Sequence, residues 1–272
     1  MSELEEYLEF AKGLAEDAGK IMLKYFRTDS LQTNIKDDLT PVTLADTEVN
    51  SMVISRVKEK YPGHGVLGEE ESINLDSKQL WVVDPLDGTG NFAGGIPQFA
   101  FSIALVSDGA AQIAVVYDPI PKRLLQAIKD KGAYENGRKL DISNNSLKDS
   151  LVISSWVVGG IENSVFKDKA VHAKFADSYA QRGSIDVKDF PIAYALAIVA
   201  ADSLDGVVSS IKTPWDVAAG SLIAEEAGAK VTDLFGNAVK AWDKDANGIL
   251  AASPKLHAQL LEIIKPALKD SK

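Results

Sequence analysis

The spacing of hydrophobic residues changes along this chain, and a helical spacing comes first, at the N-terminus. From Leu4 to Phe26, apolar side chains recur every three or four positions, which is the spacing of one face of a helix. Residues 3–27 are therefore predicted to form an amphipathic helix. The polar residues 30–40 predict a loop, and residues 43–60 predict a second helix that ends at a Pro-Gly pair.

The middle of the chain carries short apolar runs instead of helical spacing. Turn residues such as Asp, Gly and Pro separate these runs, so strands are the expected structure. The predicted strands are 80–84, 101–107, 111–117, 123–128 and 133–134.

A polar, turn-rich stretch at residues 140–150 follows, and beyond it strands and helices alternate. We therefore expect an N-terminal α+β half, residues 1–146, and a C-terminal α/β half, residues 147–272. Such an order of elements indicates layers of sheet and helix packed on one another. The elements predicted after residue 150 are strands at 151–156, 205–209 and 249–252, and helices at 161–178 in part, 193–201, 215–227 and from 254 onward.

Composition narrows the class of protein. The chain has 272 residues, of which 46% are hydrophobic and 25% are charged, as in an ordinary globular protein. Its longest apolar runs are about eight residues, whereas a membrane helix needs about 20, so no membrane span is expected. The acidic start of the chain lacks a basic and then apolar leader, which predicts a cytoplasmic location.

Missing and scarce residue types exclude several kinds of chemistry. The chain has no cysteine, which excludes thiol nucleophiles, disulfides and zinc–thiolate sites. Its three histidines, His64, His172 and His257, lack the spacing of metal ligands. A net charge of −10 argues against a nucleic acid polymer as partner. A small anionic substrate is still compatible, because bound metal ions reverse the local field. The chemistry is therefore expected to rest on carboxylates.

The segment 81–92, with the sequence WVVDPLDGTGNF, carries the most informative chemistry. An apolar strand brings Asp84 and Asp87 to its end, where both carboxylates can reach one small volume. Crowded carboxylates repel each other, and a bound hard cation with oxygen ligands relieves the repulsion. Gly88 and Gly90 let backbone N–H groups approach an anion closely. The segment therefore predicts a metal-bridged phosphate.

Three further acidic features stand out. Glu69 and Glu70 follow a short strand-like piece. Asp216 lies in the first turn of a predicted helix, and Asp46 lies near the start of another. Each has a purely structural interpretation: a solvated charge run, an interaction with the helix dipole, or an exposed helix residue. Residues 84–88 also fit a plain turn. The combination of these features favours a metal site.

A competing interpretation of the glycine-rich segment is dinucleotide binding. Residues 88–93 match the loose G-x-G-x-x-A fingerprint, and Asp108 lies about 20 residues beyond its start. That motif needs a long helix after the glycines, whereas residues 94–97 predict a short one. It also needs a strand that runs directly into the first glycine, and residues 84–87 are expected to interrupt the strand. We therefore prefer the metal site.

Three motifs, in this order and spacing, resemble the inositol monophosphatase family of magnesium-dependent, lithium-sensitive phosphatases. The resemblance spans most of the chain and implies a mixed α/β (α+β) fold, a layered αβαβα sandwich of the sugar-phosphatase type. It also implies a homodimer, inhibition by lithium, and hydrolysis of a phosphate monoester by metal-activated water. The motifs are residues 68–70, residues 84–92, and residues 215–220 followed by 226–228.

The resemblance further implies a ligand set for two to three Mg²⁺ ions. Glu69, Asp84 and the Leu86 carbonyl would bind the first ion. Asp84 would bridge to the second ion, which Asp87 and Asp216 would also bind. A third, more weakly held ion would lie near Glu69.

The remaining implied roles concern water, phosphate and substrate. Thr89, hydrogen-bonded towards Asp46, would help to orient the attacking water, and the amides of Gly88 and Thr89 would bind the phosphate. The implied catalytic residues are Glu69, Thr89 and Asp46, the implied substrate-binding residues are Asp87, Gly88, Thr89 and Ser209, and the supporting residues are Glu70 and Lys36.

The substrate side departs from the family pattern. Where many members carry an acid that binds the inositol ring, this chain has Ser209, and Phe190-Pro191 aligns with the usual Gly-Ser or Gly-Thr pair. We expect a small phosphorylated polyol or sugar as substrate, in the manner of an inositol monophosphatase. The alternatives are a 3′(2′),5′-bisphosphate nucleotidase, a fructose 1,6-bisphosphatase, a histidinol phosphatase, or a non-catalytic regulator with this fold.

Overall fold

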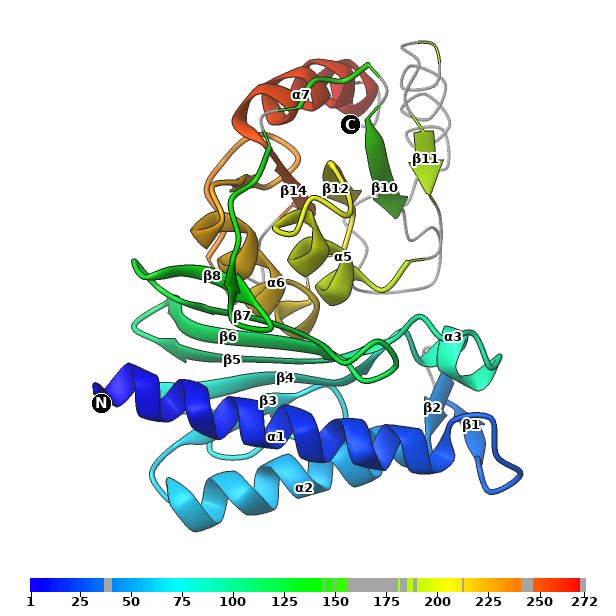
Figure 1. Ribbon diagram of the computed structural model, residues 1–272, viewed down its shortest axis with the longest axis vertical. Coiled ribbons are helices and arrows are strands. Elements are labelled where there is room, and N and C mark those ends of the chain that lie inside the picture. Colours follow the sequence, from blue (N-terminus) through cyan, green and yellow to red (C-terminus); the bar gives the residue numbers. More distant parts are fainter. Residues whose placement is uncertain are drawn as a thin grey trace.

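The computed structural model describes residues 1–36, 41–143, 145–148, 150–155, 181, 185–187, 190–211, 213–240 and 247–269. Helices and sheets alternate in five layers, so the predicted αβαβα sandwich is confirmed (Figure 1). From bottom to top of that view, the layers are helices α1 (Glu3–Tyr25) and α2 (Leu44–Lys60), a seven-stranded sheet, helices α5 (Ile192–Val199) and α6 (Pro214–Glu226), a five-stranded sheet, and helix α7 (Pro254–Lys269).

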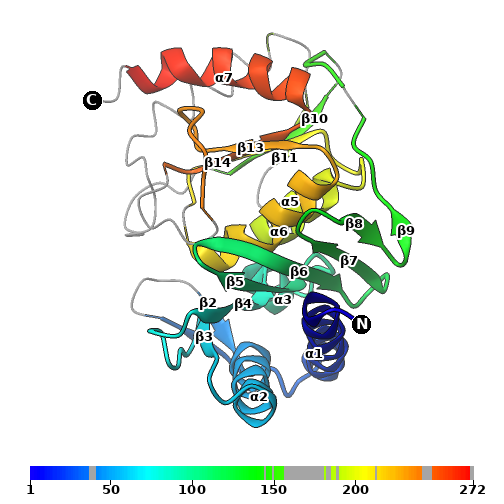
Figure 2. The same cartoon turned by 90° about the vertical axis from the view of Figure 1, so that its left-hand side faces the viewer.

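The seven-stranded sheet has its strands in the order β3-β4-β5-β6-β7-β8-β9. Its first pair, β3 and β4, is parallel, and every later pair is antiparallel. The turned view shows α1 and α2 nearly end-on, against one face of this sheet (Figure 2). The strands are β3 (Gly65–Gly68), β4 (Gln79–Asp87), β5 (Ala100–Ser107), β6 (Ala110–Asp118), β7 (Arg123–Ile128), β8 (Gly132–Glu135) and β9 (Arg138–Lys139).

The five-stranded sheet is mixed and has the order β11-β10-β12-β14-β13. The strands β11, β10 and β12 are parallel, whereas β14 runs antiparallel to both of its neighbours. Its strands are β10 (Leu151–Ser155), β11 (Ile185–Val187), β12 (Gly206–Ser209), β13 (Lys230–Thr232) and β14 (Ile249–Ala252).

The seven-stranded sheet separates two hydrophobic cores, which explains why its central strands are apolar throughout. Successive residues of a strand point to opposite faces. On β5, Ile103 and Leu105 pack in the core with α1 and α2, whereas Ala104 and Val106 pack in the core with α5 and α6. A strand that is covered on both faces has no polar face to alternate with.

Small residues let the middle helices lie close together between the two sheets. A Cβ atom at Gly220 of α6 would lie 2.5 Å from the Leu196 Cβ and 2.6 Å from the Ala193 carbonyl oxygen of α5. Any side chain at Gly220 would therefore push the two helices apart. This contact matters for function, because each of these helices begins at the candidate site.

Most predicted elements agree with the structure, except for the loop expected at 30–40 and the end of the strand expected at 80–84. The helices expected at 3–27, 43–60, 193–201 and 215–227 are confirmed to within two residues at each end. The loop expected at 30–40 is wrong in part, because β1 (Thr33–Ile35) pairs there with β2 (Pro41–Thr43). The side chains of β1 are exposed, so the sequence of this strand has no hydrophobic pattern that would predict it. The helical stretch expected within 161–178 lies outside the described residues.

Among the described residues, no helix is both long enough and apolar enough to cross a bilayer.

Candidate metal centre

Strand β4 carries two of the predicted acids, and it is longer than expected. It runs from Gln79 to Asp87 instead of ending at residue 84. Its register against β5 shifts between Asp84 and Asp87. A shift of this kind re-aims the side chains at the end of a strand.

The length of β4 corrects one argument against dinucleotide binding. The strand does run directly into Gly88, so the expected interruption at 84–87 is wrong. The other argument holds, because the helix that follows, α3 (Thr89–Ala93), has only five residues. A dinucleotide site of the type considered needs a longer helix there.

Three aspartates from two layers of the fold meet at this end of β4. One carboxylate oxygen of each of Asp84, Asp87 and Asp216 lies within 4.8 Å of the others. Asp216 reaches the cluster from the first turn of α6, which begins after Thr213 with a proline in its first turn. Asp84 and Asp87 are only 2% and 4% exposed. Within the described part of the chain, no Lys, Arg or His forms an ion pair with any of the three.

The electrostatics of this acid cluster are unfavourable for three charged carboxylates. Burial raises the pKa of Asp87 to about 7. Burial, and then the negative charges of Glu69, Asp87 and Asp216, raise the pKa of Asp84 well above its usual range. Burial and the charge of Asp87 do the same to the pKa of Asp216. Buried carboxylate oxygens without a basic partner are a suitable ligand set for a hard divalent cation.

Backbone N–H groups at the start of α5 fix Asp87. The Tyr194 amide donates to Asp87 Oδ2 over 2.8 Å, and the amides of Ile192 and Ala193 also hydrogen-bond to this carboxylate. These bonds join the end of β4 to the layer of α5 and α6. The Tyr194 hydroxyl, in turn, interacts electrostatically with Asp118 and Arg123. Sequence reasoning missed Tyr194, because the residue enters the site through its backbone.

Thr89 and Asp46 lie together, as the resemblance implies. The Thr89 hydroxyl is 2.9 Å from Asp46 Oδ1 and 3.0 Å from the Leu86 carbonyl oxygen. Asp46 Oδ2 also accepts hydrogen bonds from the Thr43 amide and hydroxyl at 2.8 and 2.5 Å, and the amide bond is part of the capping box of α2. Burial raises the pKa of Asp46, although the bonds from Thr43 and Thr89 oppose the shift. The first turn of α2 therefore holds this pair in place.

Glu69 and Glu70 lie beside the acid cluster but have their own cation. Lys36 Nζ donates to Glu69 Oε1 over 2.9 Å and to Glu70 Oε1 over 2.5 Å. These bonds raise the pKa of Lys36 against the effect of its burial. The Glu69 amide donates to the Val83 carbonyl next to Asp84. The structure therefore places Glu69 next to the three aspartates, but not among the oxygens that converge.

Position 88 requires a glycine, because of its backbone conformation and because neighbouring atoms lie too close for a side chain. Its φ angle is +94°, and a Cβ atom would lie 2.7 Å from the Pro191 Cγ and 2.9 Å from the Gln98 carbonyl oxygen. Pro191, which aligns with part of the usual Gly-Ser or Gly-Thr pair, thus lies directly against the glycine loop. This departure from the family pattern is at the site itself.

Ser209 lies at the end of β12 and is fully buried. Its hydroxyl accepts a hydrogen bond from the Ile211 amide over 3.1 Å. This bond shapes the turn that precedes α6. A direct contact with substrate stays a prediction.

Comparisons with known proteins show the family and the fold. The model of the inositol monophosphatase family matches residues 3–269. The chain is 33% identical to the Nus factor SuhB of Pasteurella multocida, over 97% of both chains. It superposes with a TM-score of 0.86 on the extragenic suppressor protein SuhB of Bartonella henselae, at 30% identity over 96% of this chain and 98% of that one. For the Thermotoga maritima IMPase, the TM-score is 0.84 at 26% identity, over 98% and 100% of the two chains.

Proposed function

This chain belongs to the inositol monophosphatase family, and we propose that it is a Mg²⁺-dependent phosphomonoesterase acting on a small phosphorylated polyol or sugar. The observation that carries the proposal is the acid cluster of Asp84, Asp87 and Asp216. Their oxygens converge, Asp84 and Asp87 are buried, and none of the three has a basic partner among the described residues. Mg²⁺ binds to such oxygens, and it bridges carboxylates to substrate phosphates.

The residues that would bind the metal fit the two to three ions of the family. Asp84, Asp87 and Asp216 supply carboxylate oxygens, the buried Leu86 supplies a carbonyl oxygen, and Glu69 supplies a carboxylate that Lys36 must first release. When bound, the metal neutralises the phosphate and lowers the pKa of the water that attacks it.

Residues of this chain would position the other reactants. Because the Thr89 hydroxyl donates its proton to Asp46 or to the Leu86 carbonyl, its lone pairs are available to accept a hydrogen bond from the attacking water. The amides of Gly88 and Thr89 would donate to phosphate oxygens. In-line attack on a phosphate needs mainly such positioning and charge stabilisation.

The choice of substrate depends on the residues that would contact the alcohol part of the phosphate ester. Ser209 offers no carboxylate to an inositol ring, and Pro191 occupies the position next to Gly88. Inositol phosphate remains the first candidate because the family carries its name. A 3′(2′),5′-bisphosphate nucleotide, fructose 1,6-bisphosphate and histidinol phosphate are the others. We also propose a cytoplasmic homodimer that lithium inhibits.

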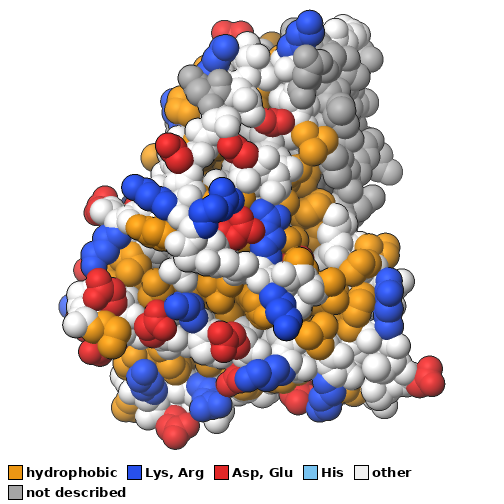
Figure 3. Space-filling view, viewed as in Figure 1, with side chains coloured by type: hydrophobic (Ala, Val, Ile, Leu, Met, Phe, Trp, Pro, Cys, Tyr) orange, Lys and Arg blue, Asp and Glu red, His pale blue; other side chains and the backbone are white. Residues whose placement is uncertain are grey.

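A regulatory role is the second candidate, and the names of relatives favour it. The relatives reported above include a Nus factor and an extragenic suppressor protein. The complete acid cluster argues against a chain that has lost catalysis. A nucleic acid polymer is not a partner in our proposal, since the net charge is −10 and the face in Figure 3 intersperses acidic and basic side chains.

The test is phosphate release from inositol 1-phosphate, fructose 1,6-bisphosphate, 3′-phosphoadenosine 5′-phosphate and histidinol phosphate, with and without Mg²⁺. We expect Mg²⁺-dependent turnover of at least one compound, and a loss of more than about 100-fold in Asp84→Asn, because altering even the partners of metal ligands costs about 10–100-fold. Asp108→Asn is the control, since Asp108 is exposed with φ of 48°, which Asn also adopts. Turnover that is independent of Mg²⁺, or full activity of Asp84→Asn, would refute the proposal.

A further inference from the structure

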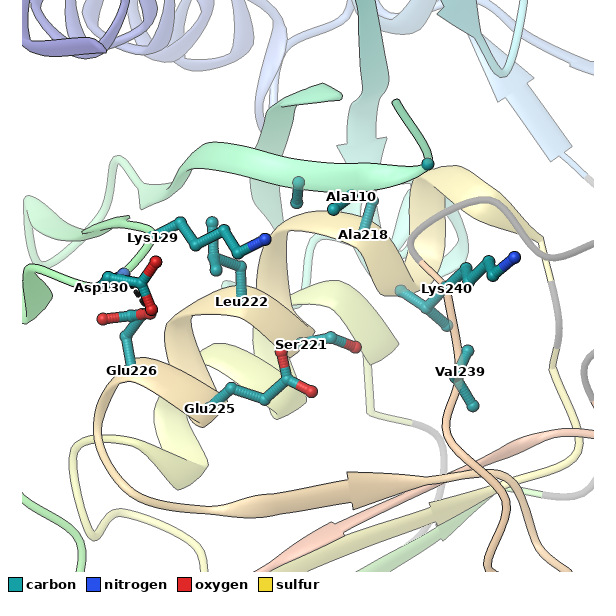
Figure 4. Close-up of a pocket in the computed structure, with 13 residues that line it drawn as sticks. Ala110, Lys129, Asp130, Ala218, Ser221, Leu222, Glu225, Glu226, Val239 and Lys240 are labelled. Atoms are coloured by element: carbon teal, nitrogen blue, oxygen red, sulfur yellow. Dashed lines mark hydrogen bonds between the residues drawn. The ribbon is translucent and has the colours of Figure 1, made fainter. Parts of the chain in front are cut away.

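A pocket lies on another face of α6, away from the acid cluster (Figure 4). Asp216 and Gly220 are four residues apart and share the face that meets α5. Ser221 and Glu225 are also four residues apart, and they face the pocket. The pocket has a volume of about 340 Å³ and lies between α6, the start of β6 and the residue after β7. This volume is at the lower end of the range for small-molecule sites, about 300–1,000 Å³.

Three polar side chains line this pocket without a direct hydrogen bond or ion pair to the residues that the structure describes. Lys129 extends its ammonium group into the pocket from the end of β7, and Glu225 lies across from it on α6 (Figure 4). Both side chains are largely exposed, and neither side chain forms an ion pair or hydrogen bond with another residue that the structure describes. The Ser221 hydroxyl oxygen is buried and has no hydrogen-bond partner either. A buried polar atom without a partner costs free energy, which a bound ligand would recover.

The neighbouring Glu226 also lines the pocket, but both of its carboxylate oxygens have hydrogen-bond partners. Its two oxygens accept hydrogen bonds from the amides of Asp130 and Gly132, each over 2.7 Å. Glu226 therefore fixes the turn after β7 to the end of α6. The Glu225 carboxylate makes no such bond; burial and the charge of Glu226 raise its pKa, and the charge of Lys129 opposes this shift.

The rest of the lining is aliphatic and short. Ala110 and Ala111 from β6, and Val217, Ala218 and Leu222 from α6, form the wall between the charged groups. Lys240 lines the rim, and its ammonium group points away from the other labelled side chains (Figure 4). The pocket thus presents one cation, one anion with a hydroxyl group beside it, and an apolar wall.

We propose that this pocket binds a small zwitterion, an aliphatic α-amino acid. Its carboxylate pairs with Lys129, its ammonium group pairs with Glu225 and donates to Ser221, and its side chain packs on Val217 and Leu222. A phosphate dianion fits less well, because Glu225 would repel it and only one ammonium group points inward. The site is separate from the acid cluster and does not depend on the proposed phosphatase activity.

The test is isothermal titration of the full chain, without Mg²⁺ or phosphate esters, with leucine, isoleucine, valine and methionine. We expect at least one to bind with a Kd below about 1 mM. N-acetylleucine lacks the ammonium group and isoamylamine lacks the carboxylate, so each should bind at least tenfold more weakly than leucine. Equal binding of these analogues, or no binding of any of the four amino acids, overturns the proposal.

Variants locate the binding. Glu225→Gln and Lys129→Met should each weaken binding at least tenfold, because each removes one of the two ionic contacts. Glu262→Gln and Lys78→Met change exposed residues outside the pocket, and they should bind as the wild type does. Unaltered binding by both pocket variants contradicts the assignment. Because no metal or ester is present, this result is independent of whether the chain hydrolyses phosphate.

Discussion

Two groups of carboxylates lie on neighbouring strands at one end of the seven-stranded sheet, and only one of them contains its own cation. At the end of β3, Lys36 neutralises Glu69 and Glu70 through direct bonds. At the end of β4, Asp84 and Asp87 meet Asp216 with no basic partner among the described residues. Both groups are poorly exposed, so burial alone does not distinguish them. The difference is the missing positive charge.

This contrast indicates where an external cation is needed. A buried group of like charges is stabilised by protonation or by a bound cation. The pKa of Asp87, raised to about 7, favours protonation of this carboxylate, and Mg²⁺ is a suitable bound cation. Lys36 already supplies a charge to Glu69, so metal and lysine compete for that carboxylate. The three predictions that follow change one side of the comparison at a time.

The largest effect is expected when the internal cation is removed. Lys36→Met leaves Glu69 and Glu70 unpaired and should lower the free energy of unfolding by about 2 kcal/mol, between the values for exposed and buried pairs. Added Mg²⁺ should reduce this loss, because the ion can neutralise Glu69 instead. Chemical denaturation with and without Mg²⁺ measures both effects.

Lys24→Met is the matched control for this experiment. Lys24 bonds Glu48 at 3.0 Å, but both side chains are largely exposed. Its loss should cost no more than about 0.5 kcal/mol. Equal destabilisation by the two substitutions would mean that the Lys36 pair does not neutralise a buried site.

A smaller effect should appear in the pH dependence of the metal-free protein. The folded-state pKa of Asp87 is raised, so folding takes up a proton, and the resulting stability is lost as pH rises through about 7. Between pH 6.5 and 8, Asp87 alone should lower stability by about 1 kcal/mol, which is about 2–4 °C in Tm. Thermal melts of wild type and Asp87→Asn over this range measure the difference.

Two histidines oppose this decline in the lower part of the window. Burial lowers the pKa of His257 to about 4 and also lowers the pKa of His64, so stability rises as their unfolded forms lose protons near pH 6.5. Both histidines are present in Asp87→Asn, so the difference between the two proteins reports Asp87. Mg²⁺ should remove most of the decline in the wild type. If wild type and Asp87→Asn decline equally, the cluster does not carry the charge imbalance described here.

The smallest effect is expected at Tyr194, whose backbone amide hydrogen-bonds to Asp87. Tyr194→Phe keeps the amide bond to Asp87 but removes the hydroxyl that interacts electrostatically with Asp118 and Arg123. The Mg²⁺ concentration for half-maximal activity should rise about threefold, below the tenfold or more typical of direct partners of metal ligands. At saturating Mg²⁺, kcat should be unchanged. A fall in kcat without a change in Mg²⁺ dependence would assign Tyr194 a different role.

The parts of this site that sequence could predict are those encoded within one element. The spacing from Leu4 to Phe26 defines α1, and the residues from Asp84 to Thr89 are adjacent in the chain. That Asp216 joins them came from the family resemblance, because no local pattern relates residues 130 positions apart. The bonds from the start of α5 to Asp87 involve backbone groups, which have no sequence signature.

Other features depend on tertiary packing and were not predictable. The strands β1 and β2 have three residues each, and the side chains of β1 are exposed. The hydroxyl of Ser209 turned out to bond the Ile211 amide within a buried turn. The pocket beside Ser221 and Glu225 forms only where α6 meets the start of β6 and the residues after β7.

The central claim is that Asp84, Asp87 and Asp216 form a site that binds divalent metal. The most direct measurement is an anomalous difference map from crystals grown with Mn²⁺ in place of Mg²⁺. The account predicts at least one manganese peak in contact with carboxylate oxygens of all three aspartates. Manganese bound only elsewhere, with these three side chains still together and free of metal, would contradict it.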